Sequence, residues 1–285
     1  MNWSKTKTIF IICFLLLDIF LGYQLVLRQK NADDQVSNLT ESPFSQYLKN
    51  KKIQINTPLP DGNQSVTFLS GRYLDFGGKG NKDLQQALQQ LAGSKNSAVQ
   101  KFQVGTPSTI IQSTFVNKVA VPQSQTDQQL FLKQYVYQGD QYRFWSYDKS
   151  KHLYQFIQTY NGHPVFSLID KKLKTLKLET DDSGKWITGY SQTFIKIKEE
   201  HAAKLDVQPI DAIQQLWDKN KIPIINRPII EQMELGYITL SENGDQSESL
   251  AYLPAWYIEV KTDQALKHYF VTGINGHIQT IDGGE

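Results

Sequence analysis

Residues 9–27, IFIICFLLLDIFLGYQLVL, form a continuous apolar stretch near the start of the sequence. In a helix that rises 1.5 Å per residue, about 19 residues extend about 28 Å, close to the ~30 Å hydrocarbon core of a bilayer. A cleaved signal peptide is the alternative, but its apolar part is usually only about 7–15 residues long and is followed by small residues. Leu21-Gly22-Tyr23-Gln24 offers no such small pair. The stretch therefore predicts a single transmembrane helix.

The charges beside this stretch predict its orientation. Two basic residues precede it and two follow it, so the count of Lys and Arg is nearly balanced. The α-amino group adds positive charge before the stretch, and Asp33 and Asp34 add negative charge after it. Because positive charge is preferentially retained inside, we expect a cytoplasmic tail of residues 1–8, an extracytoplasmic C-terminal body and a location in the cell membrane.

One face of the predicted helix carries a carboxylate. Residues 14, 18 and 22 lie one turn apart, so Phe14, Asp18 and Gly22 share this face, with Ile11 and Leu25 beside them. A carboxylate near the bilayer centre costs about 2.5–3.5 kcal/mol on insertion scales. Another helix could approach closely at Gly22 and form a hydrogen bond with Asp18. These five residues predict a partner-binding face, and a protonated Asp18 that is merely tolerated is the alternative.

The remaining sequence predicts a linker and a globular body. Residues 28–50 are polar and predict a juxtamembrane linker, whereas residues 51–285 have enough apolar residues for a core, in one domain or in lobes 51–200 and 201–285. The 30 basic and 28 acidic residues give a net charge of +2, which does not indicate nucleic acid binding. The single cysteine, Cys13, lies in the apolar stretch, so the body has no cysteine for a disulfide, a thiol nucleophile or a metal site.

The body shows mainly strand patterns. Asn161-Gly162 between two apolar runs is a strong hairpin signal. We expect strands over residues 131–137, 142–147, 153–160, 173–178, 186–197, 229–240, 255–261 and 269–281, the last interrupted at Asn275-Gly276. Tyr160-Asn161-Gly162-His163 has an echo in Ile274-Asn275-Gly276-His277, which indicates either two related lobes or a chance repeat of a common turn.

Helix signals are fewer. Asn81 is placed to cap a helix from about residue 82 to residue 91 that ends at Gly93, and Pro209 begins a second amphipathic helix. The glycine-rich loop before Asn81 lacks the spacing of a phosphate-binding loop, so no nucleotide is expected there. The pattern predicts an α+β fold in which an antiparallel sheet carries a few helices.

The body shows no motif for catalysis, a cofactor or a metal. Its five histidines, which have no ligand spacing, are His152, His163, His201, His268 and His277. The carboxylate pairs Asp181-Asp182 and Glu199-Glu200 are typical of solvated charge. The paired carboxylates of a glycosidase are defined by their distance in the folded protein and not by their spacing in the sequence, so a hydrolase stays an alternative. We expect a protein that is not an enzyme.

The N-terminus resembles that of a known family. Residues 1–12, MNWSKTKTIFII, and residues 17–21, LDIFL, are similar to the opening of the YycI (WalI) family of low-GC Gram-positive bacteria. Shorter segments support this resemblance: residues 220–223 (NKIP), 235–237 (LGY) and 255–257 (AWY). Residues 156–166 also resemble PepSY-type modules, a weaker likeness.

The family resemblance implies a function. YycI proteins are membrane proteins whose external α+β domain is similar to the membrane-distal domains of YycH. With YycH they associate with the sensor histidine kinase WalK (YycG), which acts with WalR to control cell-wall metabolism. The resemblance therefore implies a non-enzymatic regulator of WalK that binds no nucleic acid or nucleotide. The alternative is a membrane-anchored PepSY-like module that binds or inhibits a cell-envelope hydrolase or peptidase.

Overall fold

The computed structural model describes the larger part of the chain. The described residues are 53–78, 80–94, 97–169, 172–173, 176–222, 227–239, 249–263 and 265–281, with Lys7, Phe14, Leu17, Leu48 and Asn50. Contacts divide the chain into two compact units, Met1–Gln54 and Ile55–Glu285. The predicted tail, linker and lobe boundaries stay predictions.

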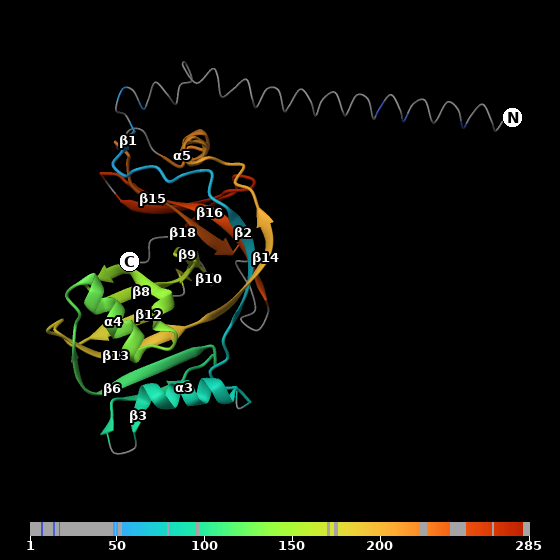
Figure 1. Ribbon diagram of the computed structural model, residues 1–285. Helices are drawn as coiled ribbons and strands as arrows, with labels where there is room; N and C mark the ends of the chain where they lie inside the picture. Colours follow the sequence, from blue (N-terminus) through green and yellow to red (C-terminus); the bar gives the residue numbers. More distant parts are fainter. Residues whose placement is uncertain are drawn as a thin grey trace. The chain divides into compact units, whose positions relative to one another are not determined.

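Strands dominate the second unit (Figure 1). Helices in the described residues of the second unit are α3 (Lys82–Ala92), α4 (Gln125–Tyr135) and α5 (Pro209–Asp218), with a short 3-10 helix η1 (Gly139–Gln141). The longer strands are β2 (Val66–Tyr73), β5 (Gln100–Val104), β6 (Ile110–Ala120), β7 (Tyr142–Asp148), β8 (Leu153–Tyr160), β9 (His163–Phe166), β12 (Leu176–Thr180), β13 (Trp186–Thr193), β14 (Ile195–Ala203), β15 (Ile229–Thr239), β16 (Leu250–Lys261), β17 (Leu266–Thr272) and β18 (Ile278–Ile281). Two-residue strands are β1 (Gln54–Ile55), β3 (Gly93–Ser94), β4 (Ser97–Ala98), β10 (Leu168–Ile169) and β11 (Lys172–Leu173). The predicted sheet with a few helices is confirmed.

The large sheet is mixed and not wholly antiparallel. Its strand order is β14-β2-β16-β15-β9-β8-β12-β13-β6-β5, with β7 beside β8, β17 beside β16 and β18 beside β17. Strands β9 and β15 run parallel, with Tyr237 opposite Val165 and Ile238 opposite Phe166. This parallel pair places β9, and β8 beyond it, on the β15 side of the sheet, although about 70 residues of sequence separate β9 from β15.

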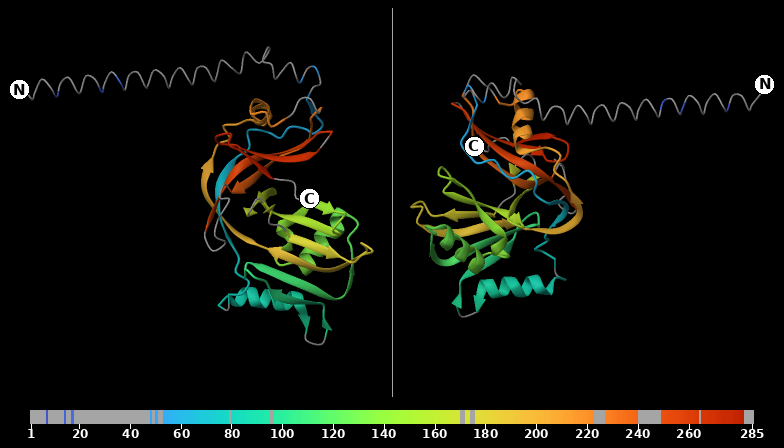
Figure 2. Two further views of the ribbon diagram at one scale, coloured as in Figure 1. Left: turned by 180° about the vertical axis from the view of Figure 1, so that it is seen from behind. Right: turned by 45° about the horizontal axis from the view of Figure 1, so that its top comes forward.

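Helix α5 covers one face of β15, β16 and β17 (Figures 1 and 2). Leu235, Trp256 and Val271 lie opposite one another on these three strands and share a face because side chains alternate along a strand. The Trp256 indole donates a hydrogen bond from Nε1 to the Val207 carbonyl, 2.8 Å away and just before α5. The apolar face of α5 is fully buried, at Ala212, Ile213 and Leu216.

Helices α3 and α4 contribute to the core that lies on β6, β8, β12 and β13. Leu84 of α3 and Phe131 of α4 are buried in the same cluster as Phe156 of β8 and Tyr190 of β13. The rings of Phe115 and Tyr135 meet edge-on with centroids 5.3 Å apart. Aromatic side chains fill much of this core, in agreement with the aromatic content of the sequence.

The prediction of a strand over residues 131–137 is wrong, because this segment continues helix α4 to Tyr135. The Ser124 hydroxyl accepts a hydrogen bond from the Asp127 amide at 3.1 Å and donates one to the Asp127 carboxylate at 2.7 Å. This reciprocal cap fixes the start of the helix. Phe131 and Tyr135 then lie one turn apart on the face that meets the core.

Several local predictions are confirmed. Asn81 caps α3 by accepting a hydrogen bond from the Leu84 amide, and Gly93 follows the helix with a φ of 85°. Pro209 begins α5. Asn161 and Gly162, with φ values of 48° and 82°, form the two-residue turn between β8 and β9.

The echoing motif at residues 274–277 forms a different turn. Here the Asn275 side chain accepts hydrogen bonds from the Thr272 hydroxyl and from the His277 amide. The likeness between the two motifs therefore does not extend to turn geometry.

The predicted strand over residues 186–197 is split at Phe194 into β13 and β14. Beyond this point, β14 pairs with β2 instead of β6. The side-chain amide of Gln158 pairs with the backbone of Ile195, donating to its carbonyl at 2.8 Å and accepting from its amide at 2.9 Å. Gln158 thus completes the hydrogen bonding of the chain where it passes from one set of strands to the other.

Candidate functional site

The predicted partner-binding face lies almost wholly outside the described residues. Phe14 is the described member of this set; it is helical and 59% exposed. Ile11, Asp18, Gly22 and Leu25 lie outside the described residues. Within the part of the chain that the structure describes, no helix is long and apolar enough to cross a membrane. The partner-binding face stays a prediction.

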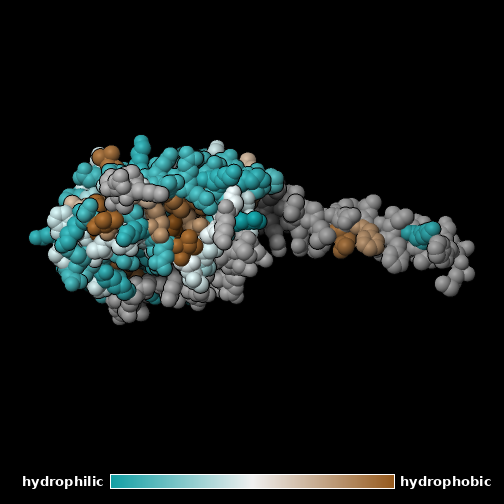
Figure 3. Space-filling view, turned by 90° about the horizontal axis from the view of Figure 1, so that it is seen from below, coloured by the Kyte–Doolittle hydropathy of each residue, from teal (hydrophilic) through white to brown (hydrophobic). Residues whose placement is uncertain are grey.

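The surface of the second unit is largely hydrophilic, with separate hydrophobic patches on the face shown in Figure 3. Exposed aromatic side chains include Phe144 and Tyr147 on β7 and Trp186 on β13, each about 40% exposed. Tyr147 and Tyr154 lie with ring centroids 4.3 Å apart.

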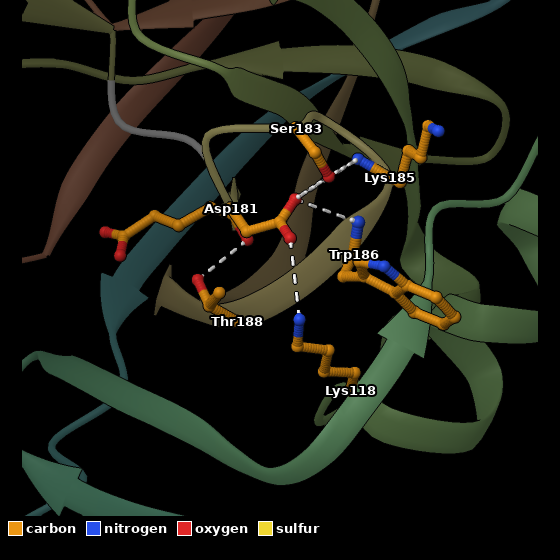
Figure 4. Close-up of polar contacts among 7 residues, drawn as sticks. Lys118, Asp181, Ser183, Lys185, Trp186 and Thr188 are labelled. Carbon is orange, nitrogen blue, oxygen red and sulfur yellow. Dashed lines mark hydrogen bonds and ion pairs between the residues drawn. The ribbon is translucent and has the colours of Figure 1, made fainter.

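The carboxylate of Asp181 organises the turn between β12 and β13 (Figure 4). One of its oxygens accepts hydrogen bonds from the Ser183 hydroxyl at 2.7 Å and from the amides of Lys185 and Trp186 at 3.3 Å. The Ser183 bond is the main reason why the pKa of Asp181 is lowered. Asp181 therefore has a structural role in its own turn.

Lys118 of β6 lies beside this turn and points toward Asp181 in Figure 4. Its Nζ is 3.9 Å from the second Asp181 oxygen and 5.9 Å from the centroid of the Trp186 ring. Lys118 is 70% exposed, so the ion pair contributes little to stability. The contacts of Asp181 and Lys118 therefore hold the turn between β12 and β13.

The carboxylates of Glu199 and Glu200 accept hydrogen bonds from side chains of other strands. Glu199 accepts a hydrogen bond from the Tyr160 hydroxyl at 2.6 Å, and Glu200 accepts one from the Ser70 hydroxyl at 2.5 Å. Their strand, β14, pairs with β2 on one side. Among the described residues, no group of three or more His, Cys, Asp or Glu could hold a metal ion.

A more extensive arrangement lies where β7 meets β15, β16 and β17. We call it the junction cluster, and its members are Arg143, Glu234, Tyr257, Glu259 and His268. Arg143 of β7 contacts Glu234 of β15, with 2.5 Å between Nη2 and Oε2. Gln232 donates a second hydrogen bond to the other Glu234 oxygen at 2.8 Å. This pair joins strands that are far apart in the sequence.

Tyr257 lies at the centre of the junction cluster. Its hydroxyl donates to Glu259 at 3.1 Å and is 2.7 Å from Nδ1 of His268. His268 lies directly opposite Glu259 in the pairing of β16 and β17, with 3.5 Å between Nδ1 and Oε2. The donor in the His268 contact depends on the tautomer of the imidazole. When Nδ1 carries the proton it donates to the tyrosine, and the single hydroxyl proton is then free to reach Glu259.

The ring of Tyr257 belongs to a buried aromatic group. It stacks on Phe166 at 5.3 Å and 18°, and meets Trp145 of β7 at 4.9 Å and 66°. Burial, followed by the charge of Glu259, raises the pKa of Tyr257, so the hydroxyl keeps its proton. Burial also lowers the pKa of His268 below its usual 6.5, against the opposing effect of Glu259.

An open pocket of about 560 Å³ lies next to Glu259. It is lined by Glu231, Glu259, Lys261, Thr262, Asp263, Ala265 and Leu266, at the end where β16 turns into β17. The pocket gives water access to one side of the junction cluster.

The sequence did not reveal this cluster. Its members come from four strands, and the interval from Arg143 to His268 is 125 residues, so no local spacing marks them. In the sequence, His268 is one of five histidines without ligand spacing. His268 can be assigned to the cluster only from its position opposite Glu259, and that position depends on the register of β16 and β17.

Comparison with solved structures finds a likeness of fold. An uncharacterized protein from Eubacterium rectale matches with a TM-score of 0.52 and 10% identity, over 81% of this chain and 92% of that chain. YycH from Bacillus subtilis matches with a TM-score of 0.39 and 14% identity, over 79% of this chain and 54% of that chain. The YpeB C-terminal domain from Bacillus megaterium matches with a TM-score of 0.39 and 10% identity, over 74% of this chain and 100% of that chain.

A comparison with curated proteins finds no match. A comparison with family models does: the model of the YycI protein family matches residues 29–274, which is most of the chain. That interval begins after the predicted transmembrane stretch, so the match is independent of the N-terminal resemblance. The chain belongs to the YycI protein family.

Proposed function

We propose that this protein is a non-enzymatic membrane regulator of the sensor histidine kinase WalK that acts together with YycH. The match of the YycI family model to residues 29–274 is the observation that carries the proposal. YycI is a regulatory family and not a known enzyme family, and membership indicates a role in the WalK two-component system. The carboxylates of Asp181, Glu199 and Glu200 each accept hydrogen bonds within the fold, which is a structural role.

Regulation of a kinase by a binding protein has a thermodynamic requirement. The regulator must bind one signalling state of WalK more tightly than the other, because equal affinity for both states shifts neither. A tenfold preference corresponds to about 1.4 kcal/mol, which a few contacts between helices can supply.

In the proposed complex the helix of residues 9–27 supplies one contact, through the face formed by Ile11, Phe14, Asp18, Gly22 and Leu25. Asp18 forms a hydrogen bond with a polar group of a neighbouring helix, and Gly22 allows that helix to approach. The extracytoplasmic body supplies the contact with YycH. Cell-wall metabolism is then controlled through WalK and its response regulator WalR.

The test compares wild type with Asp18→Leu in the membrane at matched protein levels. We expect Asp18→Leu to reduce co-purification of WalK several-fold and to change the output of a WalR-dependent reporter. Asp18→Asn keeps a hydrogen-bonding side chain and should retain most of the binding. Leu16→Ala lies on the opposite side of the predicted helix and should behave as wild type.

Two outcomes would reject parts of the proposal. Unchanged co-purification and unchanged output for Asp18→Leu would reject the helix face as the contact. A protein lacking residues 1–50 that still produced the wild-type output would show that the anchor is dispensable. The alternative, an external module that acts on a cell-envelope hydrolase or peptidase, would then be favoured.

A further inference from the structure

His268 is the member of the junction cluster whose charge can change between pH 7 and pH 5. The groups that face it come from every strand packed around it. Tyr257 and Glu259 face it from β16, and Ile281 of β18 lies opposite it in the strand pairing. Through Tyr257 the cluster continues to the ion pair of Glu234 on β15 and Arg143 on β7.

The charges of this cluster are unbalanced when His268 is neutral. Arg143 is 2.5 Å from Glu234, so these two opposite charges compensate each other. Glu259, in contrast, receives its hydrogen bond from the neutral hydroxyl of Tyr257. A proton on His268 would place a positive charge 3.5 Å from Glu259. Glu259 is thus the carboxylate that can pair with a positive charge on His268.

The packing opposes that proton. The imidazole of His268 stacks on the Tyr257 ring, with centroids 5.9 Å apart and planes 16° apart, and only 22% of its side chain is exposed. Burial of a charged ring is unfavourable, and its effect on the pKa of His268 is larger than the attraction of Glu259. Contact with water would therefore favour the protonated form of His268. Glu259, its neighbour, lines the open pocket.

We propose that His268 is a pH-sensitive switch whose protonation loosens the packing of Tyr257 against Trp145 and so weakens the contact between β16–β17 and β7. Tyr257 links the two elements, because its ring contacts both His268, at 5.9 Å between centroids, and Trp145, at 4.9 Å. This proposal does not rest on the regulation of WalK.

The test uses the full chain in detergent or nanodiscs, labelled with 5-fluorotryptophan. The protein has five tryptophans, and the resonance of Trp145 is assigned with Trp145→Phe. Carbon-labelled histidine, assigned with His268→Gln, reports the protonation of His268 in the same samples. We expect the Trp145 resonance to move between pH 7.5 and pH 5 with the same midpoint as His268, below 6.5.

Three variants separate a switch from a general effect of acid. In His268→Gln the Trp145 resonance should no longer follow pH. In Glu259→Gln the midpoint should fall to lower pH, because the attracting carboxylate is gone. His201→Gln alters an exposed histidine on β14 and should titrate as wild type.

The proposal is overturned if His268 takes up its proton while the Trp145 resonance stays still. It is equally overturned if Trp145 responds to pH in His268→Gln as it does in wild type. A midpoint that Glu259→Gln leaves unchanged would show that Glu259 does not belong to the switch. Folding of each variant is checked by the dispersion of the remaining fluorotryptophan resonances at pH 7.5.

Discussion

At the scale of single residues, His268 links stability to pH. Its pKa in the folded protein is lowered by burial from the unfolded value of 6.5. The unfolded chain therefore binds more protons than the folded chain as the pH falls through 6.5, and the free energy of unfolding decreases with acidification. The contribution of neutral His268 is fully present above 6.5, and its loss is complete below the folded pKa.

We expect urea unfolding of wild type to show a fall in stability between pH 7 and pH 5 that is smaller in His268→Gln. The variant lacks the titrating ring, so its curve should be flatter over this window even if its stability at pH 7 is lower. His201→Gln serves as the control, because the side chain is exposed. Parallel curves for wild type and His268→Gln would contradict this assignment.

At the scale of elements, the stability of helix α4 depends on the cap formed by Ser124 and Asp127. Replacement of Ser124 by Ala removes the hydroxyl that accepts from the Asp127 amide. We expect a loss of about 1 kcal/mol in the free energy of unfolding, within the usual range of about 0.5–2 kcal/mol for a cap. Ser124→Asp keeps an acceptor and should retain most of that stability. Chemical denaturation at neutral pH measures the free energy of unfolding of both variants. Equal stability of Ser124→Ala and wild type would contradict the role of the cap.

Sequence signals of short range predicted the elements that they control. Asn81 and Pro209 mark helix starts, and Asn161-Gly162 marks a hairpin, because each acts through the backbone of its own neighbours. The strand predicted for residues 131–137 is wrong because their aromatic and apolar residues fit either period. The signal that decides for a helix is the N-cap residue upstream, Ser124.

The junction cluster could not be predicted in this way. The meeting of Arg143 with Glu234 depends on β7 reaching β15, and the contact of His268 with Tyr257 depends on the register of β16 and β17. Neither contact can be recognised from the spacing of these residues in the sequence. The predicted face around Asp18 follows from helical periodicity alone, and it awaits the membrane experiment.

At the scale of the whole molecule, the Arg143–Glu234 pair tests how strongly β7 is held to β15. A double-mutant cycle with Arg143→Met and Glu234→Gln isolates their coupling. We expect about 1–3 kcal/mol, because both side chains are partly buried, with exposures of 35% and 20%.

The Lys198–Glu200 pair on β14 is the matched control for this cycle. Its lysine is 78% exposed and its atoms are 3.4 Å apart. The coupling there should stay below about 1 kcal/mol. If the two cycles gave equal couplings, Arg143 and Glu234 would have no special part in joining β7 to β15.

The passage from β13 into β14 is unusually sensitive to substitution of one side chain. Ordinary strand pairing tolerates most substitutions, because every residue carries the same peptide group. Next to Ile195 the pairing groups belong instead to the side chain of Gln158. A single change to glutamate would replace the donor with a second acceptor facing the Ile195 carbonyl, in a position that is almost fully buried. The hydrogen bonds of the Ile195 backbone thus depend on the identity of Gln158, and a single mutation or deamidation at this residue can break them.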